Sequence, residues 1–283
     1  MPFHIWPDVG DPAAVEYLVA WQPPENLFQR FPNLRVVFSI GAGVDQFSLA
    51  DFPPEVRLVR MLDPGITQGM VEYVVMATLA LHRDLPAYLH AQRERRWQAL
   101  PSKPAQEREV GIMGLGNLGC AVLAQLRALG FAVRGWSRSS HQIEGVRCHA
   151  GPEGLGDFLA DCDILVCMLP LTPATTGILC GDTFARLPRG AALIAAGRGG
   201  HMVEEDLLAA LASGQLGAAV IDVLNDEPPP GDHPFWPHPQ ILLTPHIAAT
   251  TRVETGCSVL LDNIRRHQAG QPIPGEVDRL SGY

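Results

Sequence analysis

One glycine-rich segment restricts the possible folds of this chain more than any other feature. Gly114-Leu115-Gly116-Asn117-Leu118-Gly119 directly follows the strand-like segment Glu109–Met113 and precedes an apolar run of helical spacing, Cys120–Leu129. In such a strand–turn–helix unit, the first glycine permits the tight turn, the second lets the backbone approach a pyrophosphate, and the third lets the helix pack on the strand. The helix N-terminus adds N–H donors and the positive end of its dipole. Isolated glycines at this spacing are often plain turns, but this context predicts dinucleotide contacts from Gly114, Gly116, Asn117, Leu118 and Gly119.

The remainder of the chain alternates short apolar runs with segments of helical spacing. Continuous apolar strands separated by helices are typical of parallel sheets covered on both faces, so we expect an α/β fold. The predicted strands are Tyr17–Trp21, Arg35–Ser39, Val56–Val59, Val110–Met113, Ala132–Trp136, Ile164–Leu169, Ala191–Ala195, Ala218–Asp222 and Ile241–Thr244.

Two long helices help to divide the chain into domains. One is predicted from about Gln68 into the region of Arg93, and the other from about Arg252 to His267. A length of 283 residues suits two modest domains. We therefore predict a Rossmann dinucleotide-binding domain at residues 69–251, inserted into a smaller discontinuous substrate domain at residues 1–68 and 252–283.

Composition excludes several classes of partner. The formal net charge of −9 argues against nucleic acid, because phosphate binding needs clustered cations. The basic cluster Arg93–Arg96 is interrupted by Glu94 and is typical of a solvated helix face. The six cysteines show no metal-ligand spacing, so we assign no metal. The N-terminus does not resemble a signal peptide and no apolar run is long enough to span a bilayer, so no membrane partner is expected and a cytoplasmic location is predicted.

The strand that follows the glycine-rich unit ends in a segment that bears on the choice of cofactor. An NAD-selective site places Asp or Glu at this strand end to bind the ribose 2′-hydroxyl. Here the segment is Ser137-Arg138-Ser139, in which a cation and two hydroxyls suit a 2′-phosphate. An ordinary polar loop is the alternative. We predict that NADP(H) is preferred and that NAD(H) remains possible.

Three polar residues follow predicted strands downstream of the glycine-rich unit, and their chemistry is complementary. Arg198 can bind a carboxylate in a planar fork, His246 can transfer a proton near neutral pH, and Glu227 can stabilise a protonated histidine. These are the demands of reducing a 2-oxo acid. Each residue alone could be an ordinary loop residue. Together, at strand ends where open α/β sheets bind ligands, they indicate a catalytic set.

The order of these motifs resembles the D-2-hydroxyacid dehydrogenase family, and details such as Trp136-Ser137-Arg138 resemble its glyoxylate/hydroxypyruvate reductase A branch. The resemblance covers nearly the whole chain. Its motifs, in order, are Gly41-Ala42-Gly43-Val44-Asp45, Ala196-Gly197-Arg198-Gly199, Val203-Glu204-Glu205-Asp206, Ile221-Asp222-Val223, Asp226-Glu227-Pro228 and Thr244-Pro245-His246-Ile247.

The resemblance implies roles for the matching positions. Arg198 would bind the substrate carboxylate and polarise the ketone, His246 would donate the proton, and Glu227 would hold His246 charged. The backbone N–H groups of Ala42 and Gly43 would bind the other side of the carboxylate. The implied cofactor contacts are Leu169, Pro170, Ala196, Gly197 and, near the nicotinamide, Asp222.

The resemblance also implies NADPH-dependent reduction of glyoxylate or hydroxypyruvate by a homodimer, with a bulkier 2-oxo acid left open. The small domain would be flavodoxin-like but N-terminally shortened, because the match begins near the family's second strand, around Tyr17–Trp21. A strand-and-helix unit of on the order of 30 residues would then be missing or reduced. The alternative function is a dinucleotide-sensing binding protein or co-repressor on the same fold.

Overall fold

The computed structural model describes residues 3–279 and divides the chain into two compact units. The smaller unit consists of Met1–Ile66 and Thr250–Tyr283, and the larger unit of Thr67–Ala249. Residues 1–2 and 280–283 of the predicted small domain lie outside the described part. Cofactor binding by the larger unit and substrate binding by the smaller unit stay predictions.

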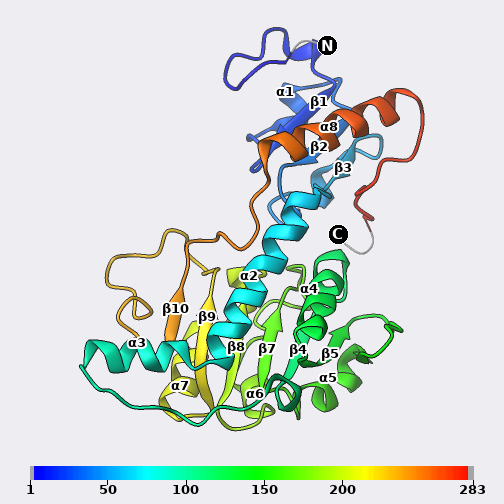
Figure 1. Cartoon of the computed structure of the whole chain (residues 1–283). Coiled ribbons are helices and arrows are strands. Elements are labelled where there is room, and N and C mark those ends of the chain that lie inside the picture. The colour runs from blue at the N-terminus through cyan, green and yellow to red at the C-terminus, as the bar shows by residue number, and fades with distance from the viewer. Residues whose placement is uncertain (1–2, 280–283) are drawn as a thin grey trace. The chain divides into compact units, whose positions relative to one another are not determined.

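The larger unit is built on one parallel sheet in the order β10-β9-β8-β7-β4-β5-β6 (Figure 1). The strand order reverses between β4 and β7, and open α/β sheets bind ligands outside the carboxyl ends at such a point. The predicted α/β fold with parallel sheets is confirmed. The strands are β4 (Glu109–Met113), β5 (Ala132–Ser137), β6 (Arg147–Ala150), β7 (Ile164–Cys167), β8 (Ala191–Ala195), β9 (Leu216–Ile221) and β10 (Ile241–Leu243).

Helices cover both faces of this sheet because successive side chains of a strand point to opposite sides. Ile112 of β4 packs in a core with residues of α2 and α4, whereas the adjacent Met113 packs in a second core with residues of α5, α6 and α7. These two cores explain the continuous apolar runs of the central strands. The helices are α2 (Pro64–His82), α3 (Leu85–Arg93), α4 (Asn117–Ala128), α5 (Gly151–Leu159), α6 (Gly181–Ala185) and α7 (Glu204–Ala212), with 3-10 turns η3 (Ala105–Glu107) and η4 (Gly199–His201).

The smaller unit contains a second parallel sheet in the order β1-β2-β3. Val37 packs on one face with Phe31 of the segment after α1, and Phe38 packs on the other face with Leu260 of α8. This unit therefore has its own core. Its elements are η1 (Pro12–Ala14), β1 (Tyr17–Ala20), α1 (Leu27–Arg30), β2 (Val36–Ser39), η2 (Leu49–Asp51), β3 (Arg57–Val59) and α8 (Val253–Gln268).

The structure corrects the first long helix, which is two helices rather than one. α2 ends at His82 and α3 begins at Leu85. Asp84 between them has a left-handed backbone with φ 54°, and Pro86 lies in the first turn of α3. A proline inside a continuous helix would remove a hydrogen bond and clash with the preceding turn, so the chain starts a new helix there.

Strand β6 was missed because its sequence lacks the apolar signal. Arg147 and His149 alternate with Cys148 and Ala150, and no residue of the strand is fully buried. Among the strands of residues 3–279, β6 pairs only with β5, at the edge of the sheet. An edge strand needs no continuous apolar run, since less of its surface packs against other elements.

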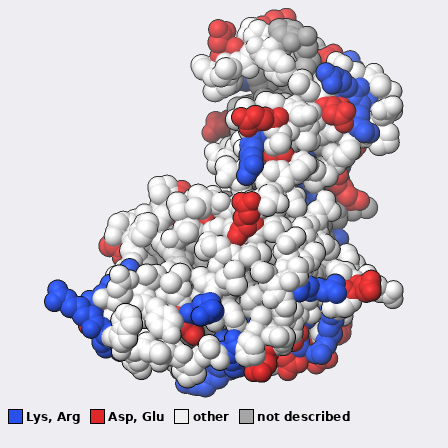
Figure 2. Space-filling view, in the orientation of Figure 1, with Lys and Arg blue, Asp and Glu red and all other residues white. Residues whose placement is uncertain are grey.

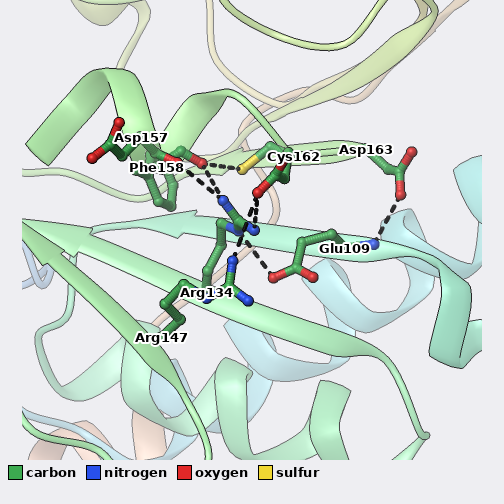
Figure 3. Close-up of polar contacts among 8 residues, drawn as sticks. Glu109, Arg134, Arg147, Asp157, Phe158, Cys162 and Asp163 are labelled. Atoms are coloured by element: carbon green, nitrogen blue, oxygen red, sulfur yellow. Dashed lines mark hydrogen bonds and ion pairs between the residues drawn. The ribbon is translucent and has the colours of Figure 1, made fainter.

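The largest fully buried side chain of the described residues is an arginine in the middle of β5. Figure 3 shows Arg134 reaching Glu109 of β4, with Nε 2.9 Å from Oε1. Its Nη2 lies 2.9 Å from Asp161 Oδ2, and its Nη1 donates to the carbonyl oxygens of Asp157 and Phe158 at 3.1 and 3.2 Å. Each donor group has an acceptor, which is the condition for burying a charge. Arg134 thereby joins two strands to the end of α5.

Acidic and basic side chains are interspersed over the face seen in Figure 2, and basic side chains gather over the end of α3. Arg93, Arg95 and Arg96 are all exposed there, and Arg96 pairs with Glu94 at 2.7 Å. Among residues 3–279, no helix has the length and apolar character needed to cross a membrane.

Candidate active site

The three predicted catalytic residues all follow neighbouring strands of the larger unit. Arg198 follows β8, Glu227 follows β9 and His246 follows β10. Because these strands are parallel neighbours, their carboxyl ends share one edge of the sheet. The backbone continues this pairing past the strands: Asp222 N donates to Ala195 O at 2.9 Å, and His246 N donates to Asp222 O at 2.9 Å.

Glu227 and His246 form a direct pair. Glu227 Oε2 lies 2.7 Å from His246 Nδ1, and the side chains are 35% and 31% exposed. The other oxygen, Oε1, accepts from the Leu224 N–H at 2.9 Å. Both carboxylate oxygens are therefore engaged, and the contact fixes the orientation of the imidazole, with Nδ1 toward Glu227.

His246 lies in a strained turn that a buried aspartate stabilises. Its φ of 52° is left-handed, a conformation that costs a non-glycine residue energy. Asp222 is 1% exposed, and its carboxylate accepts from the backbone N–H groups of Ile247 and Ala248 at 2.9 and 2.8 Å and from the Thr244 hydroxyl at 2.6 Å. Asp222, predicted to lie near the nicotinamide, is thus also the residue that shapes the His246 turn.

A tyrosine of α2 extends this network. Tyr73 is buried, and its hydroxyl lies 2.6 Å from the Thr244 hydroxyl. Burial raises the pKa of Tyr73, so the phenol stays protonated at physiological pH. A protonated phenol can keep donating to the Thr244 hydroxyl, which in turn donates to Asp222.

Arg198 begins a tight turn that packs against the turn carrying Glu227. Its backbone N–H donates to Nδ1 of His201 at 3.1 Å, and its guanidinium donates to Gly197 O at 2.8 Å. A Cβ on Gly199 would lie 1.9 Å from Leu224 O, so only glycine fits this contact between backbones. The turns of Arg198 and Glu227 therefore have a fixed spacing.

The glycine-rich unit has the features that a dinucleotide needs. Gly114 has φ 108°, and a Cβ there would lie 2.9 Å from Met168 O. A Cβ on Gly119 would lie 1.9 Å from Gly114 O, whereas a Cβ on Gly116 would meet no atom of residues 3–279 within 4 Å. Gly114 and Gly119 are therefore required by packing, but Gly116 faces open space. An open backbone at the N-terminus of α4 fits a pyrophosphate.

The other predicted cofactor residues lie at the same edge of the sheet. Helix α4 begins at Asn117, earlier than predicted, so Asn117 and Leu118 form its first turn. Leu169 and Pro170 follow β7, and Ala196 and Gly197 follow β8. A Cβ on Gly197 would lie 3.2 Å from Leu169 O, so these two segments are in contact.

The predicted 2′-phosphate segment lies at the end of β5. Ser137 is 8% exposed, and its hydroxyl donates to Ser139 O at 2.7 Å, which shapes the turn. Arg138 and Ser139 are exposed. The Ser137 hydroxyl thus holds the turn, while Arg138 and Ser139 are placed to meet a ligand from solvent.

Ala42 and Gly43 belong to the smaller unit and follow β2. The buried Ser39 organises their loop: Gly41 N donates to its hydroxyl oxygen at 3.2 Å, and the hydroxyl donates to Gly43 O at 2.9 Å. Substrate binding by Ala42 and Gly43 stays a prediction from the sequence.

Sequence reasoning missed the residues that hold the catalytic turns. Tyr73 and His201 act through a hydroxyl contact and a backbone contact that no motif shows, and Thr244 belongs to a motif but its hydrogen bond to Asp222 was not anticipated. Ser39, which shapes the Ala42–Gly43 loop, was missed as well. A weak signal was present for His201, because a histidine just after a strand-end arginine can accept from its backbone. Within residues 3–279, no group of three or more His, Cys, Asp or Glu side chains could hold a metal ion.

Comparison with known proteins decides the family. Residues 75–248 match the family model of the D-isomer specific 2-hydroxyacid dehydrogenase, NAD binding domain. This chain belongs to that family. The resemblance inferred from the ordered motifs is therefore confirmed.

The similarity to individual members of the family extends over almost the whole chain. Glyoxylate/hydroxypyruvate reductase A of Yersinia enterocolitica is 40% identical over an alignment 280 residues long, which covers 97% of this chain and 90% of that protein. A D-isomer specific 2-hydroxyacid dehydrogenase of Xanthobacter autotrophicus Py2, solved with NADPH and MES, has a TM-score of 0.92 at 44% identity and covers 97% of this chain and 87% of its own. The NADPH-dependent glyoxylate/hydroxypyruvate reductase of Sinorhizobium meliloti, solved with NADP and sulfate, has a TM-score of 0.91 at 41% identity, with coverages of 98% and 89%.

Proposed function

We propose that this dehydrogenase reduces small 2-oxo acids, glyoxylate and hydroxypyruvate, to 2-hydroxy acids with NADPH. The observation that carries the proposal is the 2.7 Å pair of Glu227 and His246, at the same sheet edge as Arg198 and the glycine-rich unit. A histidine bonded to a carboxylate is a typical proton donor. The names of the reductases in Yersinia and Sinorhizobium support the substrate class.

The residues present fit NADPH. The open backbone at Gly116 and the first turn of α4 would hold the pyrophosphate, and Arg138 with Ser139 would bind the 2′-phosphate. The rest of the cofactor would be lined by Leu169, Pro170, Ala196 and Gly197. Asp222, which holds the His246 turn, would lie near the nicotinamide. When bound, NADPH supplies the hydride. The similar dehydrogenases solved with NADPH or NADP support this preference, and NAD(H) stays possible.

The protein's own residues bind, orient and protonate the substrate. Arg198 binds the substrate carboxylate in a planar fork and polarises the ketone oxygen. His246 is bonded to Glu227 through Nδ1, so its proton reaches the ketone oxygen from Nε2. Glu227 stabilises the imidazolium before this transfer and fixes the ring afterwards. A dinucleotide sensor or co-repressor needs no proton donor, so the pair disfavours that alternative. Homodimerisation and a cytoplasmic location stay predictions.

Replacing the proton donor tests this function. In His246→Ala, the rate of NADPH oxidation with glyoxylate should fall by about 10²–10⁴-fold, the usual contribution of general acid catalysis. NADPH affinity, measured by nicotinamide fluorescence, should be unchanged because the glycine-rich unit is intact. Turnover near the wild-type rate would exclude His246 as the proton donor.

A further inference from the structure

The first residue of α7, Glu204, lies outside the proposed catalytic set, yet its carboxylate is fully engaged. Its Oε1 accepts from the backbone N–H and the side-chain amide of Asn225, at 3.1 and 3.2 Å. Its Oε2 lies 3.0 Å from Nε2 of His233. The Glu204 and His233 side chains are only 18% and 13% exposed. A carboxylate that accepts hydrogen bonds from two distant points of one loop links those two points to the start of α7.

The His233 contact has a defined direction. His233 Nδ1 accepts from the Phe235 N–H at 3.3 Å, so Nε2 carries the hydrogen and donates to Glu204. The ring also packs edge-on against Phe235, with centroids 4.8 Å apart, and Phe235 is 1% exposed in the core of the larger unit. His233 is therefore an anchored donor that needs no positive charge to bind Glu204.

Glu204 thus holds both ends of the segment Asn225–His233, which carries Glu227. The segment has no helix or strand, and Pro228, Pro229 and Pro230 have no N–H groups to donate. Asn225 to Pro228 are exposed. A side-chain carboxylate supplies the restraint that backbone hydrogen bonds provide in regular structure.

The restraint acts on the catalytic pair through a short path. Asn225 adjoins Leu224, whose N–H binds Glu227 Oε1, and Glu227 Oε2 meets His246. The Asn225 side-chain amide also donates to Met202 O at 3.3 Å, in the turn that follows Arg198. A shift of Asn225 would therefore move both Glu227 and the contact of Gly199 with Leu224.

We propose that Glu204 is a positioning residue, which fixes the Asn225–His233 segment so that Glu227 stays within hydrogen-bond reach of His246 and the Arg198 turn keeps its spacing. The proposal rests on the proposed reductase function. It assigns His233 and Asn225 to the same device, as the donors that Glu204 holds.

A plain structural role predicts something different. An acidic residue in the first turn of α7 stabilises the helix dipole wherever its side chain points. Glu205 has the same charge in the same turn, but it is exposed and no hydrogen bond joins it to the Asn225–His233 segment among the described residues. Glu205→Ala is therefore the matched control for Glu204→Ala, since both remove one carboxylate from the same helix end.

Steady-state kinetics with glyoxylate and NADPH test the proposal. Glu204→Ala should lower kcat by between about tenfold and a hundredfold, the scale of losing alignment by about 1 Å, while the Kd for NADPH stays within about twofold. Glu204→Gln keeps an oxygen for Asn225 but loses the acceptor for His233, so its loss should be smaller. Glu205→Ala should match the wild type. If the kcat of Glu204→Ala equals that of Glu205→Ala, the proposal is wrong. Should Glu204→Ala fail to fold, the same comparison is made with Glu204→Gln.

A double-mutant cycle separates positioning from general destabilisation. In a Glu227→Ala background no carboxylate is left to position, so the change Glu204→Ala should cost less in kcat than it does in the wild type, with only its effect on the Arg198 turn remaining. A loss as large as in the wild type, which multiplies fully with that of Glu227→Ala, would overturn the proposal.

A readout without turnover keeps this test independent of the proposed function. Amide hydrogen exchange at Asn225 should be faster by about tenfold or more in Glu204→Ala than in Glu205→Ala, because its acceptor is removed. If the wild type reduces no 2-oxo acid, the function has failed, and equal exchange in the two variants would separately refute the restraint.

Discussion

Adding one methyl group at Gly116 separates cofactor binding from folding. The backbone of Gly116 has φ −81° and ψ −168°, which alanine adopts readily, and the new Cβ would meet no atom of the described part of the chain within 4 Å. Folding should therefore be unaffected, or favoured by about 0.4–1 kcal/mol through a less flexible unfolded chain. The same methyl group would occupy the space that a pyrophosphate needs.

The size of the binding defect follows from overpacking. Forcing a methyl group into a filled contact costs about 1–3 kcal/mol. Since about 1.4 kcal/mol is a factor of ten, the Kd for NADPH should rise by roughly 5- to 150-fold. Urea unfolding and a fluorescence titration with NADPH measure the two quantities on the same protein. An unchanged Kd would refute the assignment of Gly116 to the pyrophosphate.

Gly119→Ala is the contrasting control. Its Cβ would lie 1.9 Å from Gly114 O, a backbone atom that cannot move without separating α4 from β4. Here the free energy of unfolding should fall by about 1–3 kcal/mol or more. Stability equal to the wild type would contradict the packing role assigned to Gly119.

Three further predictions concern the cofactor, the core and pH. Arg138→Asp should raise the KM for NADPH at least about tenfold while changing that for NADH little, because a charge-assisted bond of about 1.5–3 kcal/mol is lost only with the 2′-phosphate; equal losses would count against it. Arg134→Met should lower the free energy of unfolding in urea by about 3 kcal/mol, the low end for breaking a buried pair, since Asp161 is 64% exposed and can rehydrate; a neutral effect would contradict the role of this network. Burial, with Arg108 nearby, lowers the pKa of His82 below its ordinary 6.5, so the contribution of the neutral His82 to stability is present above pH 6.5 and is lost as the pH falls through the folded-state pKa. The variant His82→Leu should therefore show a flatter decline of the urea midpoint below pH 6.5. An unaltered slope would show that other groups cause the decline.

The sequence predicted the fold well where burial leaves a strong pattern. Central strands such as Ile164–Cys167 and Ala191–Ala195 are buried on both faces, so their residues are continuously apolar and easy to recognise. The polar edge strand Arg147–Ala150 has no such pattern. The break between α2 and α3 was signalled by Pro86, but the apolar spacing on both sides concealed it.

In the candidate site, the catalytic residues could be predicted from the sequence, whereas the residues that hold their loops in place could not. Arg198, Glu227 and His246 are polar residues at strand ends, and parallel strands bring such ends together, so their placement at one edge could be anticipated. Glu204, His201 and Ser39 act through hydrogen bonds to backbone or to neighbouring loops. Those contacts depend on loop conformations that a single sequence does not specify.

The most direct test of the central claim is the rate at which the wild-type protein oxidises NADPH in the presence of glyoxylate, hydroxypyruvate or pyruvate. We expect turnover with glyoxylate or hydroxypyruvate, with one 2-hydroxy acid formed for each NADPH consumed. Binding of NADPH without turnover of any of the three 2-oxo acids would contradict the claim, and would favour a dinucleotide sensor on the same fold.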